Sequence, residues 1–132
     1  MYITQHDISH KVMLVKLTYT YRPGTTDFNL YEAVRGVWRA SYDRASSVDY
    51  VFGIHGQTIV AVYKPTKWHY VRDRVDVPRP HEIRGAEFER VKNRLYFVCN
   101  DYKEKDEWQE HYLGQVITDL QIGQNPVSYI NA

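Results

Sequence analysis

Two sets of cationic and aromatic side chains have the types and spacing that suit ligand binding. The first set is Arg35, Trp38, Arg39 and Arg44, and the second is Lys64, Lys67, Trp68 and Tyr70. Arginine forks match phosphate groups bidentately, and tryptophan or tyrosine rings stack on nucleobases. The two sets therefore predict a surface that binds RNA or DNA, including a modified or extruded base.

Both sets also have an ordinary structural explanation. Trp38 could belong to the core while the arginines near it are solvated, because large aromatic rings are usually buried and arginines usually exposed. Trp68 and Tyr70 could likewise point inward from a strand. The sequence leaves these alternatives open.

Residues with metal-binding or nucleophilic chemistry form no recognised motif in this sequence. Among six histidines, His6 and His10 are four residues apart but lack an accompanying carboxylate pattern. The one cysteine, Cys99, ends an apolar segment, which favours a buried and inert thiol. We therefore predict no catalytic residue, no metal and no cofactor. The acidic segment 104–110 fits a solvated helix face, or alternatively a mimic of nucleic-acid phosphates.

Composition indicates a globular chain, which we expect to form one domain over residues 1–132. With 43% hydrophobic and 25% charged residues, a chain of this length can bury a core without disulfides. The first residues lack the pattern of a signal peptide, and no apolar run approaches membrane-spanning length. We therefore expect a cytoplasmic protein without a membrane partner.

Charge is unevenly distributed along the chain although the net charge is only +1. Residues 64–94 hold nine Lys or Arg against five Asp or Glu, whereas residues 95–132 hold two against six. The basic segment could form one face that attracts phosphates, or the two segments could lie together and neutralise each other. Both arrangements remain open.

Arg35, Trp38 and Arg39 are expected on a helix over about 30–42, opened by a capping box of Asn29 and Glu32, and Arg44 in a polar loop over 43–49. One row of this helix carries two arginines and should be at least partly exposed, since arginine is rarely buried unpaired. This row is Tyr31, Arg35 and Arg39. Gly36 within the helix would let another backbone approach closely.

Apolar patterns predict strands at 11–21, 50–54, 58–63, 94–99, 115–120 and 127–130. The turn 55–57 makes 50–54 and 58–63 a hairpin. Segment 72–93 reads as a long charged excursion with a short helix at about 86–92, and 104–113 as a short acidic helix. The order of elements predicts an α+β fold: a small, highly curved mixed sheet or barrel with two short helices.

The segments 30–41, 50–68, 94–99 and 112–131 together resemble a PUA-like small barrel, the superfamily that includes ASCH and EVE domains. The run YEAVRGVWR at 31–39 and the run QNPVSYI at 124–130 are similar to small bacterial and phage domains found appended to GIY-YIG nucleases. The resemblance covers about two-thirds of the chain. It implies binding of RNA, DNA or a modified base in a cleft beside the first helix.

The chain departs from these families at two points. The ASCH pattern has a lysine two residues after the glycine, where this sequence has Trp38, and Arg39 or Arg44 would have to replace it. Segment 72–93 is also longer and more charged than the corresponding family connection. The GIY-YIG motif itself is absent, so the resemblance implies no nuclease activity.

The sequence favours a non-catalytic nucleic-acid-binding module, with two alternatives. The first is an ASCH-type enzyme that acts on a modified nucleoside or nucleotide, for which Lys67 and Glu32 are the available catalytic candidates. The second is a small phage or bacterial interaction protein that sequesters a nucleotide signal or blocks a defence protein. The oligomeric state is left open.

Overall fold

The computed structural model describes residues 1–17, 21–22, 24–121 and 123–132. Its strands are β1 (Tyr2–Ile3), β2 (Val12–Lys16), β3 (Gly36–Trp38), β4 (Tyr50–His55), β5 (Thr58–Tyr63), β6 (Lys67–Tyr70), β7 (Leu95–Val98), β8 (Val116–Ile117) and β9 (Val127–Ile130). Its α-helices are α1 (Asp27–Val34), α2 (Tyr42–Ser46), α3 (Ala86–Val91) and α4 (Glu107–Tyr112). Short 3-10 helices are η1 (Gln5–Asp7), η2 (Val71–Asp73) and η3 (Pro80–Glu82).

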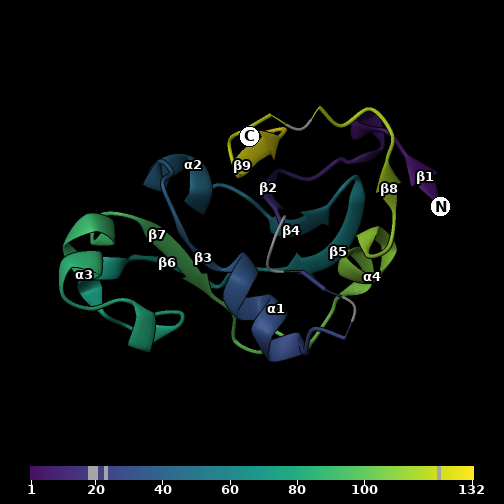
Figure 1. Ribbon diagram of the computed structural model, residues 1–132. Helices are drawn as coiled ribbons and strands as arrows, with labels where there is room; N and C mark the ends of the chain where they lie inside the picture. Colours follow the sequence, from purple (N-terminus) through teal and green to yellow (C-terminus); the bar gives the residue numbers. More distant parts are fainter. Residues whose placement is uncertain (18–20, 23, 122) are drawn as a thin grey trace.

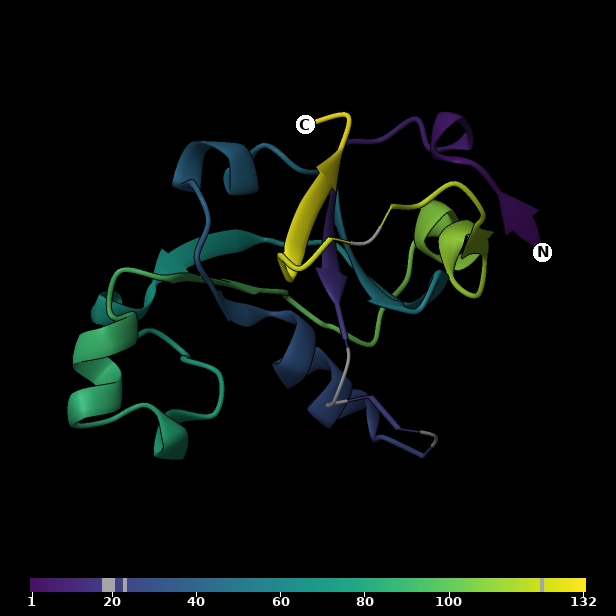
Figure 2. The same cartoon turned by 45° about the horizontal axis from the view of Figure 1, so that its top comes forward.

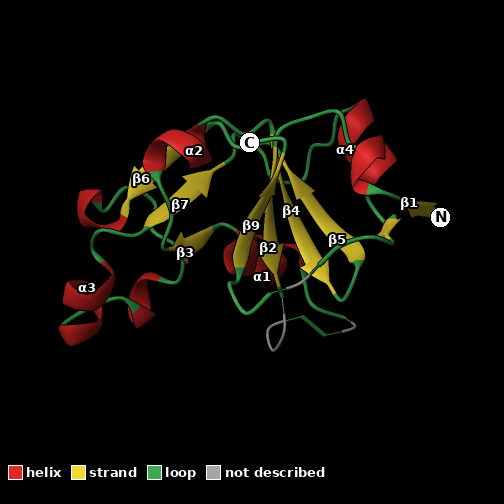
Figure 3. Cartoon of the chain, turned by 90° about the horizontal axis from the view of Figure 1, so that it is seen from above, coloured by secondary structure: helices red, strands yellow, loops and turns green. Residues whose placement is uncertain are grey.

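A strongly curled sheet of six strands, like half of a barrel, forms the larger part of the fold (Figures 1 and 3). Its strand order is β1-β8-β5-β4-β2-β9, with β2 parallel to β4 and antiparallel to β9. The predicted hairpin is present as β4 and β5, and its turn uses Gly56 at φ +65°. The predicted α+β class with a small curved mixed sheet is therefore confirmed.

A second sheet of three strands, β3-β7-β6, lies beside the first and carries residues from both predicted binding sets (Figure 3). All its pairings are antiparallel. Leu95 on the middle strand is in register with Trp38 on one neighbour and with Tyr70 on the other. One central strand thus fixes the positions of two aromatic residues that are far apart in the sequence.

Apolar side chains cover both faces of the large sheet. On one face, Val34 of α1, Phe97 of β7 and Trp68 of β6 pack against Met13 of β2. On the other face, residues of β2, β4 and β5 pack around Tyr112 of α4. Helix α1 comes close to the sheet at Gly53, where an added Cβ would lie 2.9 Å from the Val34 side chain.

The helix predicted over 30–42 is too long, because the helix in the structure ends before Gly36. Helix α1 already ends at Val34, Gly36 begins a strand, and α2 is a separate helix that covers part of the loop predicted over 43–49. A Cβ on Gly36 would lie 2.5 Å from the Cβ of Tyr96, so the close approach predicted here is real, but it serves strand pairing. The part of the chain that the structure describes holds four α-helices, where two short helices were predicted.

The start of α1 also differs from the prediction. The Thr26 hydroxyl accepts a hydrogen bond from the Asn29 backbone N–H at 3.1 Å, so Thr26 is the N-cap. The predicted box of Asn29 and Glu32 is therefore wrong. A side-chain oxygen at the N-cap satisfies one of the first helical N–H groups, and threonine does this as asparagine would.

Most of the predicted strands are present, several with shorter bounds. The strand predicted over 11–21 appears as β2, and its residues 18–20 lie outside the described part of the chain. The strands at 94–99 and 127–130 and the helices at 86–92 and 104–113 are confirmed as β7, β9, α3 and α4. None of the described helices is long and apolar enough to cross a membrane.

The excursion, residues 72–93, is packed rather than loose. Val71 and Val91 are fully buried against Tyr96 of β7, and Phe88 of α3 packs on the same cluster. The excursion therefore forms a second, smaller layer on the three-stranded sheet, at the far left of Figure 1. Its position is set by apolar contacts, and it can act as a fixed wall.

Candidate functional site

A cleft of about 860 Å³ lies between α1, β3 and the excursion. Figures 1 and 2 show the excursion (teal to green) standing beside α1 (blue). The side chains with polar or aromatic chemistry on its walls are Lys16, Phe28, Asn29, Glu32, Trp38, Arg79, His81, Glu82, Glu87, Arg90 and Arg94. The cleft lies beside the first helix.

Arg79 ties the excursion to the end of α1. Its guanidinium donates to the Glu32 carbonyl oxygen, and it donates to the Gly36 carbonyl oxygen at 2.7 Å. Its Nε also lies 2.9 Å from a carboxylate oxygen of Glu82. The last carbonyls of a helix have no partner within the helix, and here an arginine from another segment supplies one. The wall of the cleft is thus held in place before any ligand binds.

Arg35, a member of the first predicted set, is a structural residue. Its side chain is 3% exposed, its Nε lies 2.6 Å from a Glu32 carboxylate oxygen, and it donates to the Asp76 carbonyl oxygen at 2.8 Å. The predicted exposure of its helix row is wrong for Arg35 and for Tyr31, which is 6% exposed. Because α1 ends at Val34, the chain turns inward at this point, and Glu32 supplies the paired charge that burial requires.

Trp38 combines the two roles that the sequence left open. Its indole N–H donates to the Val34 carbonyl oxygen at 2.8 Å, and its ring packs against the core. The side chain is nevertheless only half-buried and lines the cleft. The hydrogen bond fixes the ring, so that its open surface is preorganised for a flat ligand.

Arg39 and Arg94 form a pair of like charges beside the cleft. Arg39 follows β3 and Arg94 precedes β7, and the pairing of Trp38 with Leu95 brings the two arginines together. Partial burial, and then the charges of Arg90 and Arg39, lower the pKa of Arg94, while the Glu87 carboxylate opposes this shift. Among the described residues, neither Arg39 nor Arg94 has an ion pair or a side-chain hydrogen bond, whereas Arg90 binds Glu87 at 2.6 Å. This arrangement favours an anion that would relieve the repulsion.

Arg44, the last member of the first set, lies farther along the same side. It donates to the Ala132 carbonyl oxygen at 2.8 Å, and its guanidinium lies 4.0 Å from the ring centre of Tyr129. It is exposed and does not line the cleft beside α1. The structure therefore joins Trp38 and Arg39 to Arg94, buries Arg35, and leaves Arg44 at a neighbouring position.

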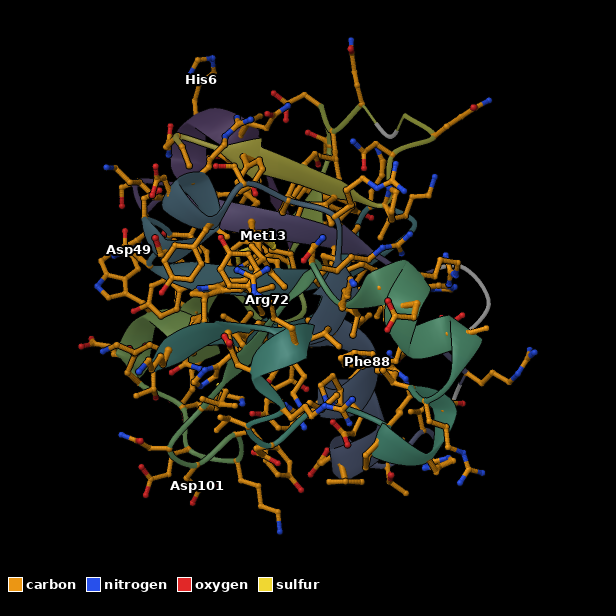
Figure 4. The ribbon with its side chains drawn as sticks, turned by 90° about the vertical axis from the view of Figure 1, so that its left-hand side faces the viewer. His6, Met13, Asp49, Arg72, Phe88 and Asp101 are labelled. Atoms are coloured by element: carbon orange, nitrogen blue, oxygen red, sulfur yellow. The ribbon has the colours of Figure 1, made fainter. Side chains whose placement is uncertain are left out.

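The second predicted set is dispersed over the molecule. Trp68 is 5% exposed and belongs to the core, so its prediction as a base-stacking residue is corrected. Tyr70 is half-buried and already stacks on Tyr42 and on the guanidinium of Arg72, which is labelled on the face shown in Figure 4. A β-strand sends alternate side chains to opposite faces, and the face with Trp68 and Tyr70 is the one turned to the core.

The two lysines of the second set lie apart from the cleft. Lys64 is exposed, faces the Asp106 carboxylate at 3.7 Å, and lines a separate cavity of about 500 Å³. Lys67 is exposed and lines neither that cavity nor the cleft beside α1. The four residues of the second set therefore do not make one surface.

The separate cavity contains the one cysteine. Burial raises the pKa of the Cys99 thiol to about 11 and lowers the pKa of Lys105 on the same wall. A thiol with a raised pKa is a poor nucleophile at neutral pH. Among the described residues, no group of three His, Cys, Asp or Glu side chains is placed to hold a metal ion.

Two arginines of the site, Arg90 and Arg94, were not singled out in the sequence. One signal for them is the excess of positive charge in segment 64–94. The other is the predicted helix followed directly by a strand, an order that places both residues at one end of the second sheet. Comparison with known proteins finds no matching family model, curated protein or solved structure. The function is therefore argued from the side chains of the cleft.

Proposed function

We propose that this chain is a nucleic-acid-binding module, that the cleft beside α1 receives a base, and that Arg39 and Arg94 bind the adjacent phosphate. The observation that carries the proposal is the arginine pair without carboxylate partners among the described residues. Two neighbouring guanidinium groups repel each other, and a phosphate between them accepts several charge-assisted hydrogen bonds. Arginine suits this role better than lysine because its planar fork matches the phosphate oxygens.

The shape and the lining of the cleft support a base as the inserted group. A volume of about 860 Å³ is within the range of small-molecule sites. Trp38 presents a fixed aromatic ring, and a ring of this kind stacks on any base. The position beside the first helix agrees with the PUA-like resemblance, which extends the proposal to a modified or extruded base.

The positions of the catalytic candidates favour a binding module over an enzyme. The Glu32 carboxylate is held by the Arg35 guanidinium at 2.6 Å, and it also accepts from the Arg79 backbone N–H at 3.4 Å. Lys67 lies outside the cleft. A general acid or base must reach the group that reacts, and these two residues do not meet at one site.

Equilibrium binding of labelled RNA and DNA pools, measured at low and at high salt, tests the proposal. We expect salt-sensitive binding that weakens about tenfold in Arg94→Gln, because a charge-assisted contact is lost. Trp38→Leu should weaken binding by a similar factor, since stacking contributes about 1–3 kcal/mol per base. Lys67→Gln is the matched control and should bind as the wild type does. Absence of salt-sensitive binding to every pool would contradict the proposal.

A further inference from the structure

A second hollow, the β9 groove, lies along the last strand of the large sheet. It has a volume of about 570 Å³. Its polar and charged walls are made by Lys16, Arg39, Ser41, Arg44, Gln121, Asn125, Ser128 and Tyr129. Its apolar walls come from Leu14, Ile54, Leu120 and Val127. Strand β9 lies at the edge of the sheet, which leaves this groove open to solvent.

The β9 groove and the cleft beside α1 share one lining residue and have others that are neighbours in the sequence. Lys16 lines both hollows, and its ammonium is held by the Gly123 carbonyl oxygen at 2.8 Å. Trp38 lines the cleft while the next residue, Arg39, lines the groove. Pro126 likewise lines the cleft, between two groove residues in the sequence. Lys16 is thus the side chain that connects the two hollows.

The charge of the β9 groove is of one sign. It carries Lys16, Arg39 and Arg44, and no Asp or Glu among its described lining residues. The Tyr129 hydroxyl is buried without a hydrogen-bond partner in the described part of the chain, and the Arg44 guanidinium covers the Tyr129 ring. Cations over a partly apolar floor are the surroundings that a sugar–phosphate chain needs, because its phosphates are anionic and its sugars are not.

We propose that the β9 groove is a second subsite for the same ligand and holds the backbone of a single-stranded polynucleotide whose base occupies the cleft. This inference rests on the proposed function and narrows it, because a free nucleoside or mononucleotide would fill the cleft alone. The phosphates cross from Arg94 and Arg39 to Lys16 and then follow Arg44 along β9. Each added nucleotide in the groove contributes contacts that a shorter ligand lacks.

The test compares a mononucleotide, a trinucleotide and an octanucleotide of one sequence, as RNA and as DNA, with an octanucleotide duplex as a further arm. Wild-type protein should bind the single-stranded octanucleotide at least about tenfold more tightly than the mononucleotide. Arg44→Gln should lose about tenfold for the octanucleotide and nothing for the mononucleotide. Arg94→Gln should lose affinity for the mononucleotide and for the octanucleotide. Lys103 lies outside both hollows, so Lys103→Gln should bind both ligands as the wild type does.

Because Arg44 also contacts Ala132, a second variant keeps that contact. Ser128→Glu places a carboxylate in the groove at an exposed position of β9 and should weaken octanucleotide binding selectively. The inference would be overturned if the wild type bound all three lengths with equal affinity, or if neither groove variant changed octanucleotide binding. Either result would leave the proposed function standing. Preference for the duplex would also overturn it. Absence of binding to every ligand would overturn the proposed function itself.

Discussion

At the scale of single residues, the arginines of this chain have opposite roles that are set by their neighbours. Arg35 is enclosed by Glu32, by the Asp76 backbone and by the ring of Tyr31. Arg39 and Arg94 have no ion-pair partner among the described residues, and each adjoins one residue of the paired positions Trp38 and Leu95. The residue type alone does not distinguish a structural arginine from one that can bind a ligand. For Arg35 the distinguishing feature is the Glu32 carboxylate, three positions earlier in the sequence.

Removing Arg35 should destabilise the fold strongly. Arg35→Ala leaves the Glu32 carboxylate, 11% exposed, without its ion-pair partner, and loss of one member of a buried pair costs about 3–5 kcal/mol. Arg39→Ala should change the free energy of unfolding by less than about 0.5 kcal/mol, as for other exposed positions. Urea unfolding followed by circular dichroism measures both. Similar values for the two variants would contradict the assignment of Arg35 as structural.

The fold should lose stability in alkaline solution. Burial raises the pKa of Cys99 from 9.0 to about 11 and that of Tyr31 from 10.0 to about 12. Both groups are more easily deprotonated in the unfolded chain. The contribution of Cys99 is complete below about pH 9 and is lost as the pH rises through 11, and that of Tyr31 is complete below about pH 10 and is lost as the pH rises through 12. The free energy of unfolding should therefore fall over this range. Cys99→Ala should make the fall less steep, and an identical pH profile in the variant would count against the buried thiol.

At the scale of elements, the sequence pattern predicts strands well and the first helix poorly. The hairpin β4–β5 is visible because its apolar runs and its glycine turn agree with each other. The helix over 30–42 failed because side-chain periodicity continues through Gly36, while the strand pairing that ends the helix depends on Tyr96, sixty positions later. Contacts between distant segments override local preference at such points.

Gly36 should tolerate no side chain. Gly36→Ala places a Cβ 2.5 Å from the Cβ of Tyr96, and relief of such overpacking by backbone shifts costs at least about 2 kcal/mol. Gly123→Ala is the matched control, because an added Cβ there has no neighbour within 4 Å. Thermal unfolding of the two variants checks the difference. An unchanged transition in Gly36→Ala would mean that β3 and β7 are not packed as described.

The candidate site is only partly predictable from the sequence, because some of its residues are brought together by contacts between distant segments. Trp38 and Arg39 could be chosen from their types, and the structure places them at the cleft and at the β9 groove. Arg94 is indicated by the positive excess of segment 64–94, but its position near Arg39 follows only from the pairing of β3 with β7. Trp68 looked like a stacking residue in the sequence, but the side of β6 that faces the core is decided by the packing of the whole sheet.

At the scale of the whole molecule, neither of the charge arrangements that the sequence left open holds throughout. Lys64 of the basic segment meets Asp106 of the acidic segment, so the two segments do neutralise each other there. Arg94 instead lies near Arg90 and Arg39, although Glu32, Glu82 and Glu87 also line the cleft, so cations and carboxylates occur together there. A net charge of +1 therefore coexists with a local group of arginines.

The excursion should loosen when Arg79 is replaced. Arg79→Gln removes the guanidinium that contacts the Glu32 and Gly36 carbonyl oxygens and the Glu82 carboxylate. We expect faster amide hydrogen exchange in η3 with unchanged protection in β4 and β5, because local opening follows local contacts. Arg84→Gln, a charge change at an exposed position of the same segment, is the control. Equal protection of η3 in wild type and Arg79→Gln would show that the apolar cluster alone holds the excursion.

The most direct test of the arginine pair is the salt dependence of binding to single-stranded RNA or DNA in the wild type and in the double variant Arg39→Gln/Arg94→Gln. A phosphate bound on a single strand contributes about 0.7 to the slope of log affinity against log salt. Because Arg39 and Arg94 share one phosphate in this account, the slope should become shallower by about 0.7 in the double variant. A slope that is the same in both proteins, or wild-type binding that does not respond to salt, would contradict phosphate binding by Arg39 and Arg94.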